Sequence, residues 1–286
     1  MTAICAGIVL YEPDITLLQQ NLAAIAPQVQ AIILVDNASQ NLEQVRAALA
    51  DVDVTWIVNK TNGGIAKALN QMMVAAAGMG FDWMVTLDQD SLSDAAMVAN
   101  MTPAMADGVI MVAPRVIDMA FAPSVKEDSA EDFEDIDRCI TSGALTRVSA
   151  VTSIGGFDER LFIDQVDNEI CLRAVSRGYR IVRSNHALLH QRYGESGVRR
   201  RVLWRVVSYH MYSPMRVYYQ QRNLIYMCKK FGTAYVPHPV FFALIRQPAA
   251  FVLKVIFQPE QRNERVKQFL RGFKDGIMMS TKTPGA

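Results

Sequence analysis

Hydrophobic and polar positions alternate regularly over the first 115 residues. Short apolar runs rich in β-branched residues lie at 3–10, 31–35, 54–58, 83–87 and 109–113. Helical patterns separate them at roughly 14–25, 41–50, 64–78 and 93–105. Strands that are apolar throughout, with helices between them, are typical of a mostly parallel sheet covered on both faces. The pattern therefore predicts an α/β fold.

The third predicted helix shows the period most clearly. Its apolar residues recur at the i, i+3, i+4, i+7 and i+8 positions and are Ile65, Ala68, Leu69, Met72 and Met73. That spacing places them on one helix face, which we expect to pack on the sheet.

The alternation stops after Pro114. The acidic stretch over 121–137 predicts a solvated loop. Near residue 200 arginines and tyrosines begin to mix with aliphatic residues at helical spacing. We expect a catalytic domain over 1–200, made of halves at about 1–115 and 116–200, followed by a C-terminal helical region over 201–286.

Residues 166–177 predict one more helix. Ile170, Ala174 and, less cleanly, Val175 should point inward, and Arg173 and Arg177 outward.

Composition narrows the class of protein. The chain has 286 residues and a formal net charge of +1, which argues against a nucleic-acid partner because such proteins carry a marked basic excess. The four cysteines form no C-x-x-C pair and fit thiols in a reducing compartment. No signal peptide is evident at the start of the sequence. The apolar stretch at 240–257 is interrupted by Arg246, Pro248 and Lys254 and falls short of a membrane span.

Polar clusters follow the first four predicted strands: YEPD, DNAS, NKTNGG and DQDS. Each one alone could be an ordinary turn. Ligands of parallel α/β sheets bind beyond the carboxyl ends of the strands, and all four clusters lie at that edge. We therefore expect a binding site there.

The DQDS cluster places Asp88 and Asp90 directly after the fourth strand. The sequence has neither a P-loop nor a G-x-G-x-x-G after the first strand. A phosphotransferase of the haloacid dehalogenase type would have Thr or Val where Leu92 stands. Paired carboxylates are hard oxygen ligands suited to Mg²⁺ or Mn²⁺ beside a diphosphate, and this interpretation fits better.

The ordered motifs GIVLYEPD, ILVDNAS, NKTNGGIAKALNQMM, TLDQDS and FIDQVDNEICLR, followed by HALLH, resemble the inverting family 2 glycosyltransferases. Within that family the chain is most similar to bacterial rhamnosyltransferases of surface polysaccharide (O-antigen, lipopolysaccharide) assembly. The resemblance covers roughly residues 3–225. It implies a GT-A fold, a nucleotide-sugar donor, favoured to be dTDP-L-rhamnose, and a saccharide acceptor linked to a polyprenyl diphosphate.

The resemblance assigns donor binding to residues after the first three strands: Tyr11, Glu12, Asp36, Asn37, Asn62, Gly63, Gly64 and Lys67. Tyr11 and Glu12 match positions that hold the base and ribose. Asp36 matches the acid that pairs with the N3–H of uracil or thymine. Asn37 shapes the turn after Asp36, and the glycine loop packs on the nucleotide.

The resemblance also implies a divalent metal, Mg²⁺ or Mn²⁺. Asp88 matches the acid near the ribose and metal, Asp90 the direct metal ligand, and His190 the histidine that completes the metal site.

Asp167 matches the general base, although many relatives have Glu-Asp where this chain has Val166-Asp167. An acid in the first turn of a helix is also favoured by the helix dipole, so Asp167 could be structural. Asp164 is a rival base, and Glu169 could be a structural partner of Arg173.

The C-terminal region mixes basic side chains with broad apolar and aromatic faces. This pattern suits helices at a membrane interface beside a lipid-linked acceptor, on the cytoplasmic face of the inner membrane. A helical cap on the catalytic domain or a homo-oligomer interface is the alternative. Arg216, Tyr219 and Arg222 could line the acceptor side in either case.

Other functions stay open at this point. The donor could be a UDP-sugar, because Asp36 does not distinguish uracil from thymine. The chain could also be an inactive nucleotide-sugar-binding module. A nucleotidyltransferase would show a glycine-rich loop after the first strand, where this chain has YEPD.

Overall fold

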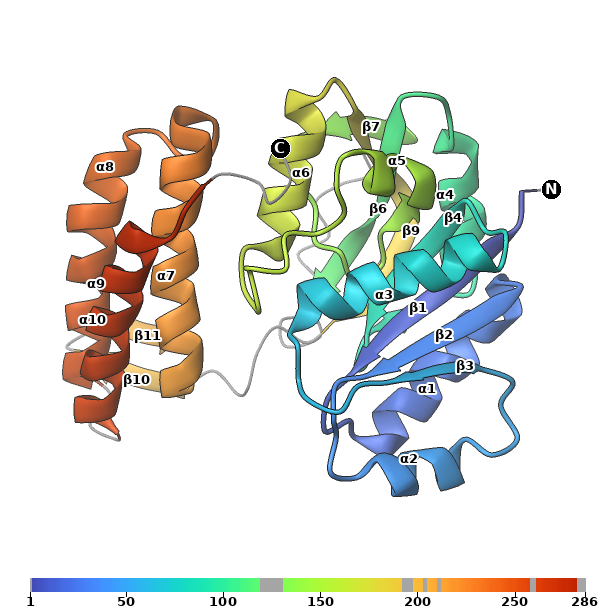
Figure 1. The fold of residues 1–286 in the computed structure, drawn as a ribbon, viewed down its shortest axis with the longest axis horizontal. Coiled ribbons are helices and arrows are strands. Elements are labelled where there is room, and N and C mark those ends of the chain that lie inside the picture. The colour runs from blue at the N-terminus through green and yellow to red at the C-terminus, as the bar shows by residue number, and fades with distance from the viewer. Residues whose placement is uncertain are drawn as a thin grey trace. The chain divides into compact units, whose positions relative to one another are not determined.

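The computed structural model describes residues 2–118, 131–191, 198–202, 205–209, 212–257 and 261–281. The chain divides into two compact units (Figure 1). The first contains Met1–Phe162 and Val166–Tyr193, and the second contains Gly194–Ala286 together with the short segment Ile163–Gln165.

The first half of the large sheet is parallel, as the sequence predicts. Its strands stand in the order β3-β2-β1-β4 and span Thr55–Val58, Ala31–Asp36, Ile4–Leu10 and Trp83–Asp88. The helices between them are α1 (Ile15–Ile25), α2 (Leu42–Ala48) and α3 (Ile65–Gly78). All four strands point the same way, so the polar clusters that follow them share one edge.

The sheet continues from β4 in the order β8-β6-β9-β5, with β7 also paired to β9. These strands are β5 (Leu92–Ser93), β6 (Val109–Asp118), β7 (Phe133–Ile136), β8 (Leu145–Arg147) and β9 (Arg180–Gln191). β8 is antiparallel to both neighbours, whereas β6 and β9 are parallel. Three helices belong to this half: α4 (Met97–Met101), α5 (Val148–Ser153) and α6 (Val166–Ser176). The α/β fold class is confirmed.

Three expectations for this half were wrong in detail. The strand at 109 does not stop at Pro114 but runs to Asp118, because a register shift between Ala113 and Arg115 accommodates the proline. The acidic stretch is not all loop: residues 121–130 lie outside the described residues, but Phe133–Ile136 forms β7 along β9. The helix expected at 93–105 is reduced to α4 and a 3₁₀ turn over Thr102–Ala104.

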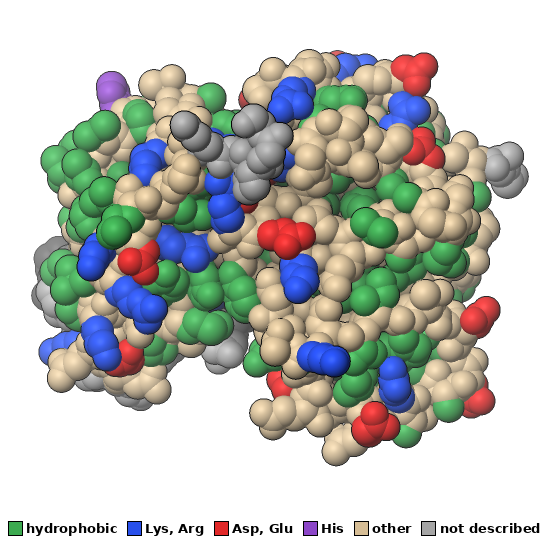
Figure 2. Space-filling model, in the orientation of Figure 1, with side chains coloured by type: hydrophobic (Ala, Val, Ile, Leu, Met, Phe, Trp, Pro, Cys, Tyr) green, Lys and Arg blue, Asp and Glu red, His purple; other side chains and the backbone are tan. Residues whose placement is uncertain are grey.

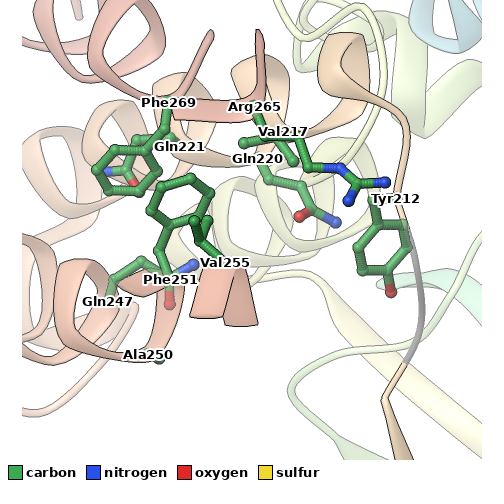
Figure 3. Close-up of a pocket in the computed structure, with 10 residues that line it drawn as sticks. All are labelled: Tyr212, Val217, Gln220, Gln221, Gln247, Ala250, Phe251, Val255, Arg265 and Phe269. Atoms are coloured by element: carbon green, nitrogen blue, oxygen red, sulfur yellow. The ribbon is translucent and has the colours of Figure 1, made fainter. Parts of the chain in front are cut away.

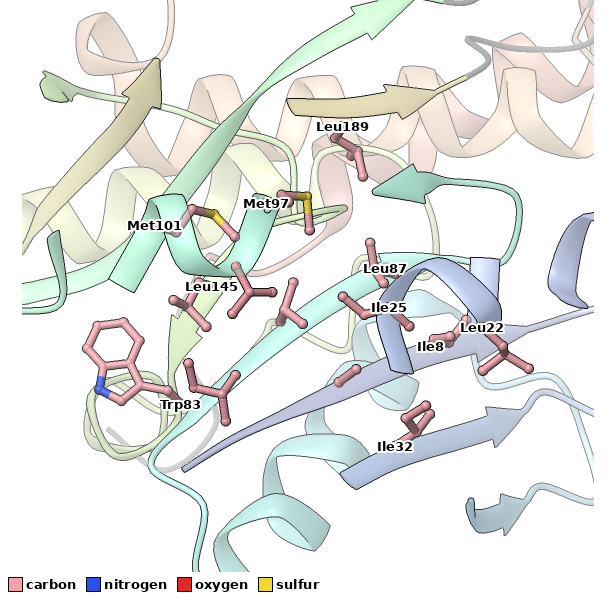
Figure 4. Packing of buried hydrophobic residues seen from close by; sticks show 14 of the residues in the cluster. Ile8, Leu22, Ile25, Ile32, Trp83, Leu87, Met97, Met101, Leu145 and Leu189 are labelled. Atoms are coloured by element: carbon pink, nitrogen blue, oxygen red, sulfur yellow. The ribbon is translucent and has the colours of Figure 1, made fainter. Parts of the chain in front are cut away.

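Both faces of the central strand β1 are covered. One face packs its buried Ile8 with Leu22 and Ile25 of α1, in a cluster that extends to α4 (Figure 4). The other face lies under α3, where a Cβ on Gly7 would come within 2.7 Å of the Met72 sulfur. Burial from both sides explains why β1 is apolar throughout.

The second unit contains a hairpin and helices. The hairpin, β10 (Val198–Val202) with β11 (Arg205–Tyr209), is an element that helical spacing did not predict. The helices are α7 (Pro214–Phe231), α8 (Pro239–Phe241), α9 (Gln247–Phe257) and α10 (Arg262–Met278), with a π-helical turn over Phe242–Arg246. Within the described residues, no helix has the length and apolar character needed to cross a membrane.

Candidate active site

The DQDS turn is tied directly to the end of β1. The Gln89 side chain accepts a hydrogen bond from the Tyr11 backbone N–H (2.9 Å) and donates one to the Tyr11 carbonyl (3.2 Å). The Tyr11 side chain is half exposed beside this double link. The predicted polar clusters YEPD and DQDS therefore meet at the edge of the sheet where the carboxyl ends of β1–β4 lie, which we call the rim.

Asp36 ends β2 with a buried carboxylate that is 1% exposed. Its Oδ2 accepts a hydrogen bond from the Ser39 N–H at 3.0 Å. Its Oδ1 has no hydrogen-bond partner among the residues that the structure describes. A buried acceptor without a donor is costly, so this oxygen is suited to an N–H that a ligand brings.

Glu12 and Asn37 use their polar atoms on the protein itself. The Glu12 carboxylate accepts from the Gln40 N–H at 2.8 Å, and its own N–H donates to Ser39 Oγ at 2.9 Å. Asn37 donates to the Gly64 carbonyl at 3.3 Å and accepts from Asn59 at 3.0 Å. Both side chains thus shape the turns of the rim.

The backbone of the Asn62–Gly64 loop requires a glycine at position 64. Asn62 Oδ1 accepts from the Gly64 N–H at 2.9 Å, and Gly64 has a φ of +85°. A Cβ on Gly64 would lie 2.7 Å from the Phe162 ring and closer still to the Phe162 carbonyl. That carbonyl accepts from the Ile65 N–H at 2.8 Å, so the loop is fixed against the segment before α6. Lys67 is exposed one turn into α3.

Asp88 is anchored through its backbone. Its N–H donates to Ser142 Oγ (3.1 Å), and its carbonyl accepts from the Asn21 amide (2.7 Å). Its carboxylate accepts from the Gln191 amide at 2.7 Å. The Asp90 carboxylate has no hydrogen bond or ion pair with any described residue.

His190 reaches the same region because β9 pairs with β5, placing it opposite Leu92. Its Nε2 lies 3.2 Å from Asp94 Oδ1. The described residues contain no group of three His, Cys, Asp or Glu side chains placed to hold a metal ion. The oxygens of Asp88 and Asp90 have the chemistry that Mg²⁺ and Mn²⁺ prefer, but His190 pairs with Asp94 instead of joining them.

Asp167 lies in the first turn of α6, half-buried, and accepts a hydrogen bond from Thr141 Oγ1 at 2.8 Å. It lines a hollow of about 440 Å³. Three arginines from separate segments share that lining: Arg115, Arg138 and Arg183. The hollow therefore combines one carboxylate that can accept a proton with cationic side chains, of which Arg183 is ion-paired with Glu134 of β7.

The rival acids are held by guanidinium groups. Glu169 is fully buried, and Arg173 binds it through two hydrogen bonds of 2.8 and 2.7 Å. Arg173 also donates to the carbonyls of Ile154 and Gly156, so the expectation that Arg173 points outward was wrong. The structural pairing of Glu169 with Arg173 is confirmed. Val175, expected to point inward, is exposed.

Asp164, the other rival, is bound by Arg216 of α7 at 3.3 and 3.2 Å. Arg222 donates to Asn223 at 2.9 Å, and its guanidinium lies 4.7 Å from the centre of the Tyr219 ring. The C-terminal arginines that the sequence placed near the acceptor therefore make contacts inside the second unit.

A cysteine in the hollow is no candidate nucleophile. The neighbouring Cys171 thiol and burial raise the pKa of Cys139 well above its usual value. A thiol that stays protonated at neutral pH attacks poorly.

The second unit has a hollow of its own, between α7, α9 and α10 (Figure 3). Phe251 and Phe269 stack there with ring centroids 4.0 Å apart. Its volume of about 40 Å³ leaves room for about one water molecule and none for a sugar.

Sequence reasoning missed the residues that support the site: Asn21, Gln89, Thr141, Ser142 and Gln191. Each acts on a site residue from another element. A local signal exists for Thr141 and Ser142, whose polar side chains interrupt an apolar run before β8.

The first unit thus has a buried acceptor oxygen on Asp36 at the rim and, separately, a hollow lined by the Asp167 carboxylate. The family model for glycosyl transferase family 2 matches residues 9–153, half of the chain. The chain belongs to the family 2 glycosyltransferases.

Individual relatives agree with this family. The dTDP-rhamnosyl transferase RfbF of Shigella flexneri is 25% identical over 300 residues, covering 96% of this chain and 95% of RfbF. Among solved structures, S. aureus TarS 1–349 in complex with UDP-GlcNAc has a TM-score of 0.63 at 14% identity, covering 97% of this chain and 81% of that one. GalNAc-T7 with UDP, GalNAc and Mn²⁺ has a TM-score of 0.61 at 12% identity, covering 96% and 55%.

Proposed function

We propose that this glycosyltransferase transfers L-rhamnose from dTDP-L-rhamnose to a saccharide acceptor, with inversion at the anomeric carbon. The observation that carries the choice of donor is the similarity to RfbF along almost the whole of both chains. The observation that carries the nucleotide site is the buried Asp36 oxygen that has no donor among the described residues.

The nucleotide base would dock on Asp36. Uracil and thymine both present an N3–H, which would satisfy the Asp36 Oδ1, and the half-exposed Tyr11 side chain lies at the same rim. A UDP-sugar is the second candidate donor, because the structurally similar TarS was solved with UDP-GlcNAc.

Asp167 would act as the general base. The Thr141 hydroxyl donates to one oxygen of the Asp167 carboxylate, and this carboxylate lines the hollow in which an acceptor hydroxyl would lie. As the acceptor oxygen bonds to the anomeric carbon, the bond from that carbon to the diphosphate breaks and the proton passes to Asp167. A single displacement of this kind inverts the configuration and needs no covalent sugar–enzyme intermediate.

Asp88 and Asp90 would hold the Mg²⁺ or Mn²⁺, and His190 would join them only after leaving Asp94. When bound, the metal supplies positive charge that stabilises the departing diphosphate.

Asp90→Ala should abolish release of dTDP from dTDP-L-rhamnose, and EDTA should do the same to the wild type. The Asp90 side chain makes no hydrogen bond or ion pair with a described residue, so we expect the circular dichroism spectrum to be unchanged. Asp53→Ala is the control, because Asp53 is exposed before β3, away from the rim. Normal turnover by Asp90→Ala would remove the metal assignment, and a wild type that never releases dTDP would favour an inactive binding module.

The acceptor would carry phosphate. Arg115, Arg138 and Arg183 line the hollow beside Asp167. Guanidinium groups bind phosphate oxygens through paired hydrogen bonds, which supports an acceptor linked to a polyprenyl diphosphate.

A lipid-linked acceptor would require the protein to work at a membrane surface, which we propose is the cytoplasmic face of the inner membrane. Val240, Phe241, Leu244 and Ile245 are all more than half exposed on the second unit, next to the exposed Arg246. Hydrophobic and basic side chains gather in the region of α8–α10 (Figure 2). Such a surface suits the interface of an anionic bilayer.

Vesicle flotation tests this surface. The wild type should float with vesicles that contain anionic lipid, and the double variant Phe241→Ser, Leu244→Ser should float much less. Val74→Ser is the matched control, because Val74 on α3 of the first unit is even more exposed than Phe241 and Leu244. If the wild type binds no vesicles but sediments as a dimer that the double variant breaks, the surface is a homo-oligomer interface.

A further inference from the structure

The segment Ile163–Gln165 belongs to the second unit, although it lies between two stretches of the first in the sequence. It leads along the chain directly into α6, whose second residue is Asp167. Asp164 and Gln165 both have left-handed backbones, with φ values of 63° and 70°. Non-glycine residues at such angles cost about 1 kcal/mol or more each, so the surrounding structure must hold them there.

Asn223 of α7 binds the backbone of this segment directly. Its side chain is fully buried, and its amide donates to the carbonyls of Ile163 (2.7 Å) and Asp164 (2.9 Å). Both amide hydrogens therefore bind consecutive carbonyls of the strained segment. Arg222 donates to the Asn223 side-chain oxygen at 2.9 Å, which fixes the orientation of the amide.

Two further side chains of the same unit complete the contact. Arg216 donates to both carboxylate oxygens of Asp164, and its guanidinium lies 4.9 Å from the centre of the Tyr212 ring. The Tyr235 hydroxyl donates to Gln165 Oε1 at 3.0 Å. Every residue of the segment thus has a hydrogen bond from α7 or from the turn that follows it.

α7 is itself held closely by α10. A Cβ on Gly276 would lie 2.8 Å from the Arg222 carbonyl, and one on Gly272 would overlap the Tyr218 carbonyl. The two helices can approach this closely only because α10 has glycines there. The helix that carries Asn223 is therefore a firm support.

We propose that Asn223 and Arg216 are positioning residues for Asp167: they hold the backbone that starts α6 and so set where the base carboxylate lies. The inference rests on the proposed function, since it needs Asp167 to be the base. A segment released from its left-handed angles would change the start of α6, and a misplacement of about 1 Å at a reacting group can cost about 10²-fold in rate. It also gives the C-terminal unit a part in catalysis.

Asn223→Leu removes both donors and keeps a side chain of similar size. In dTDP release from dTDP-L-rhamnose with Mn²⁺, we expect kcat to fall about 10- to 100-fold, because the base is displaced. The affinity for dTDP, measured by calorimetry, should stay at the wild-type value, because Asn223 binds the carbonyls of Ile163 and Asp164 and not that of Phe162, which holds the nucleotide loop. Gln221→Leu is the matched control: Gln221 is a buried amide on the same helix whose side chain has no hydrogen bond within the described structure. It should keep the wild-type kcat.

A second pair of variants avoids the risk that Asn223→Leu fails to fold. Arg216 is partly exposed, so Arg216→Ala should fold and still lose kcat, and Arg216→Lys should recover part of it because it keeps the charge beside Asp164. The positioning role would be overturned if Arg216→Ala kept the wild-type kcat. It would also be overturned if the Asn223 and Arg216 variants lost dTDP affinity in parallel with kcat. A fully active Asp167→Asn would show that the proposed base is wrong. Normal activity in the Arg216 and Asn223 variants, with Asp167→Asn inactive, would instead leave the base in place and refute only the positioning role.

Discussion

Three carboxylates fall within six positions around the start of α6, and their hydrogen-bond partners separate their roles. Arg216 binds Asp164, and Arg173 binds Glu169, whereas Asp167 accepts from a neutral hydroxyl and lines a hollow. Of the three, Asp167 is the one that lines this hollow, so its carboxylate is the one that an acceptor placed there would meet. The i, i+4 spacing correctly predicted that Glu169 pairs with Arg173. It did not predict that Arg173 points inward, because the carbonyls it binds belong to a loop distant in sequence.

Asp167→Asn should therefore lower kcat by about 10²–10⁴, the usual cost of losing a general base. The affinity for dTDP should stay nearly constant, because Asn keeps the size of the side chain. Steady-state rates of dTDP release and calorimetry on the same preparation measure both. Asp53→Asn is the control. Glu169→Gln is not a suitable one, because it would leave Arg173 buried without its charge partner. An active Asp167→Asn would place the base elsewhere.

At the scale of elements, the two ends of α3 show how a glycine can matter for different reasons. Gly64 and Gly80 have nearly the same backbone angle, with φ values of +85° and +83°. Around Gly80 no atom lies within 4 Å of an added Cβ, whereas at Gly64 the Phe162 backbone and ring occupy that space. The sequence shows two similar glycines, and only the structure shows that one of them meets the segment before α6.

Gly80→Ala should cost about 1 kcal/mol of unfolding free energy, the strain of a left-handed alanine. Gly64→Ala should cost that amount plus about 1–3 kcal/mol for the overlap with Phe162. It should also weaken dTDP binding, because the loop borders the nucleotide rim. Urea titrations of both variants measure the difference, and equal losses would show that Phe162 does not constrain the loop.

At the scale of the whole molecule, more of the first half of the chain was predictable than of the second, where the sequence predicted the helix over 166–177 and the C-terminal helices but neither β7 nor the β10–β11 hairpin. Strands β1 to β4 are local apolar runs with helices between them, so periodicity located them all. β7 was missed because its residues Phe133–Ile136 are half acidic and gain strand structure only by pairing with β9. Family resemblance proposed the metal and base residues, but Gln191 and Thr141, which bind Asp88 and Asp167, come from distant parts of the chain that no local pattern connects to them.

The central claim is that the rim around Asp36 binds a pyrimidine nucleotide and that the donor is dTDP-linked. Calorimetric titration of the protein with dTDP, UDP and GDP, each with Mn²⁺, tests it most directly. We expect dTDP to bind most tightly, UDP next and GDP at least about tenfold more weakly, because the N1–H of the two-ring guanine lies farther from the ribose than a pyrimidine N3–H and would not meet the buried oxygen of Asp36. Asp36→Ala should remove the preference. Tightest binding of UDP would contradict the rhamnose donor, and binding of GDP as tight as that of dTDP would contradict the nucleotide site itself.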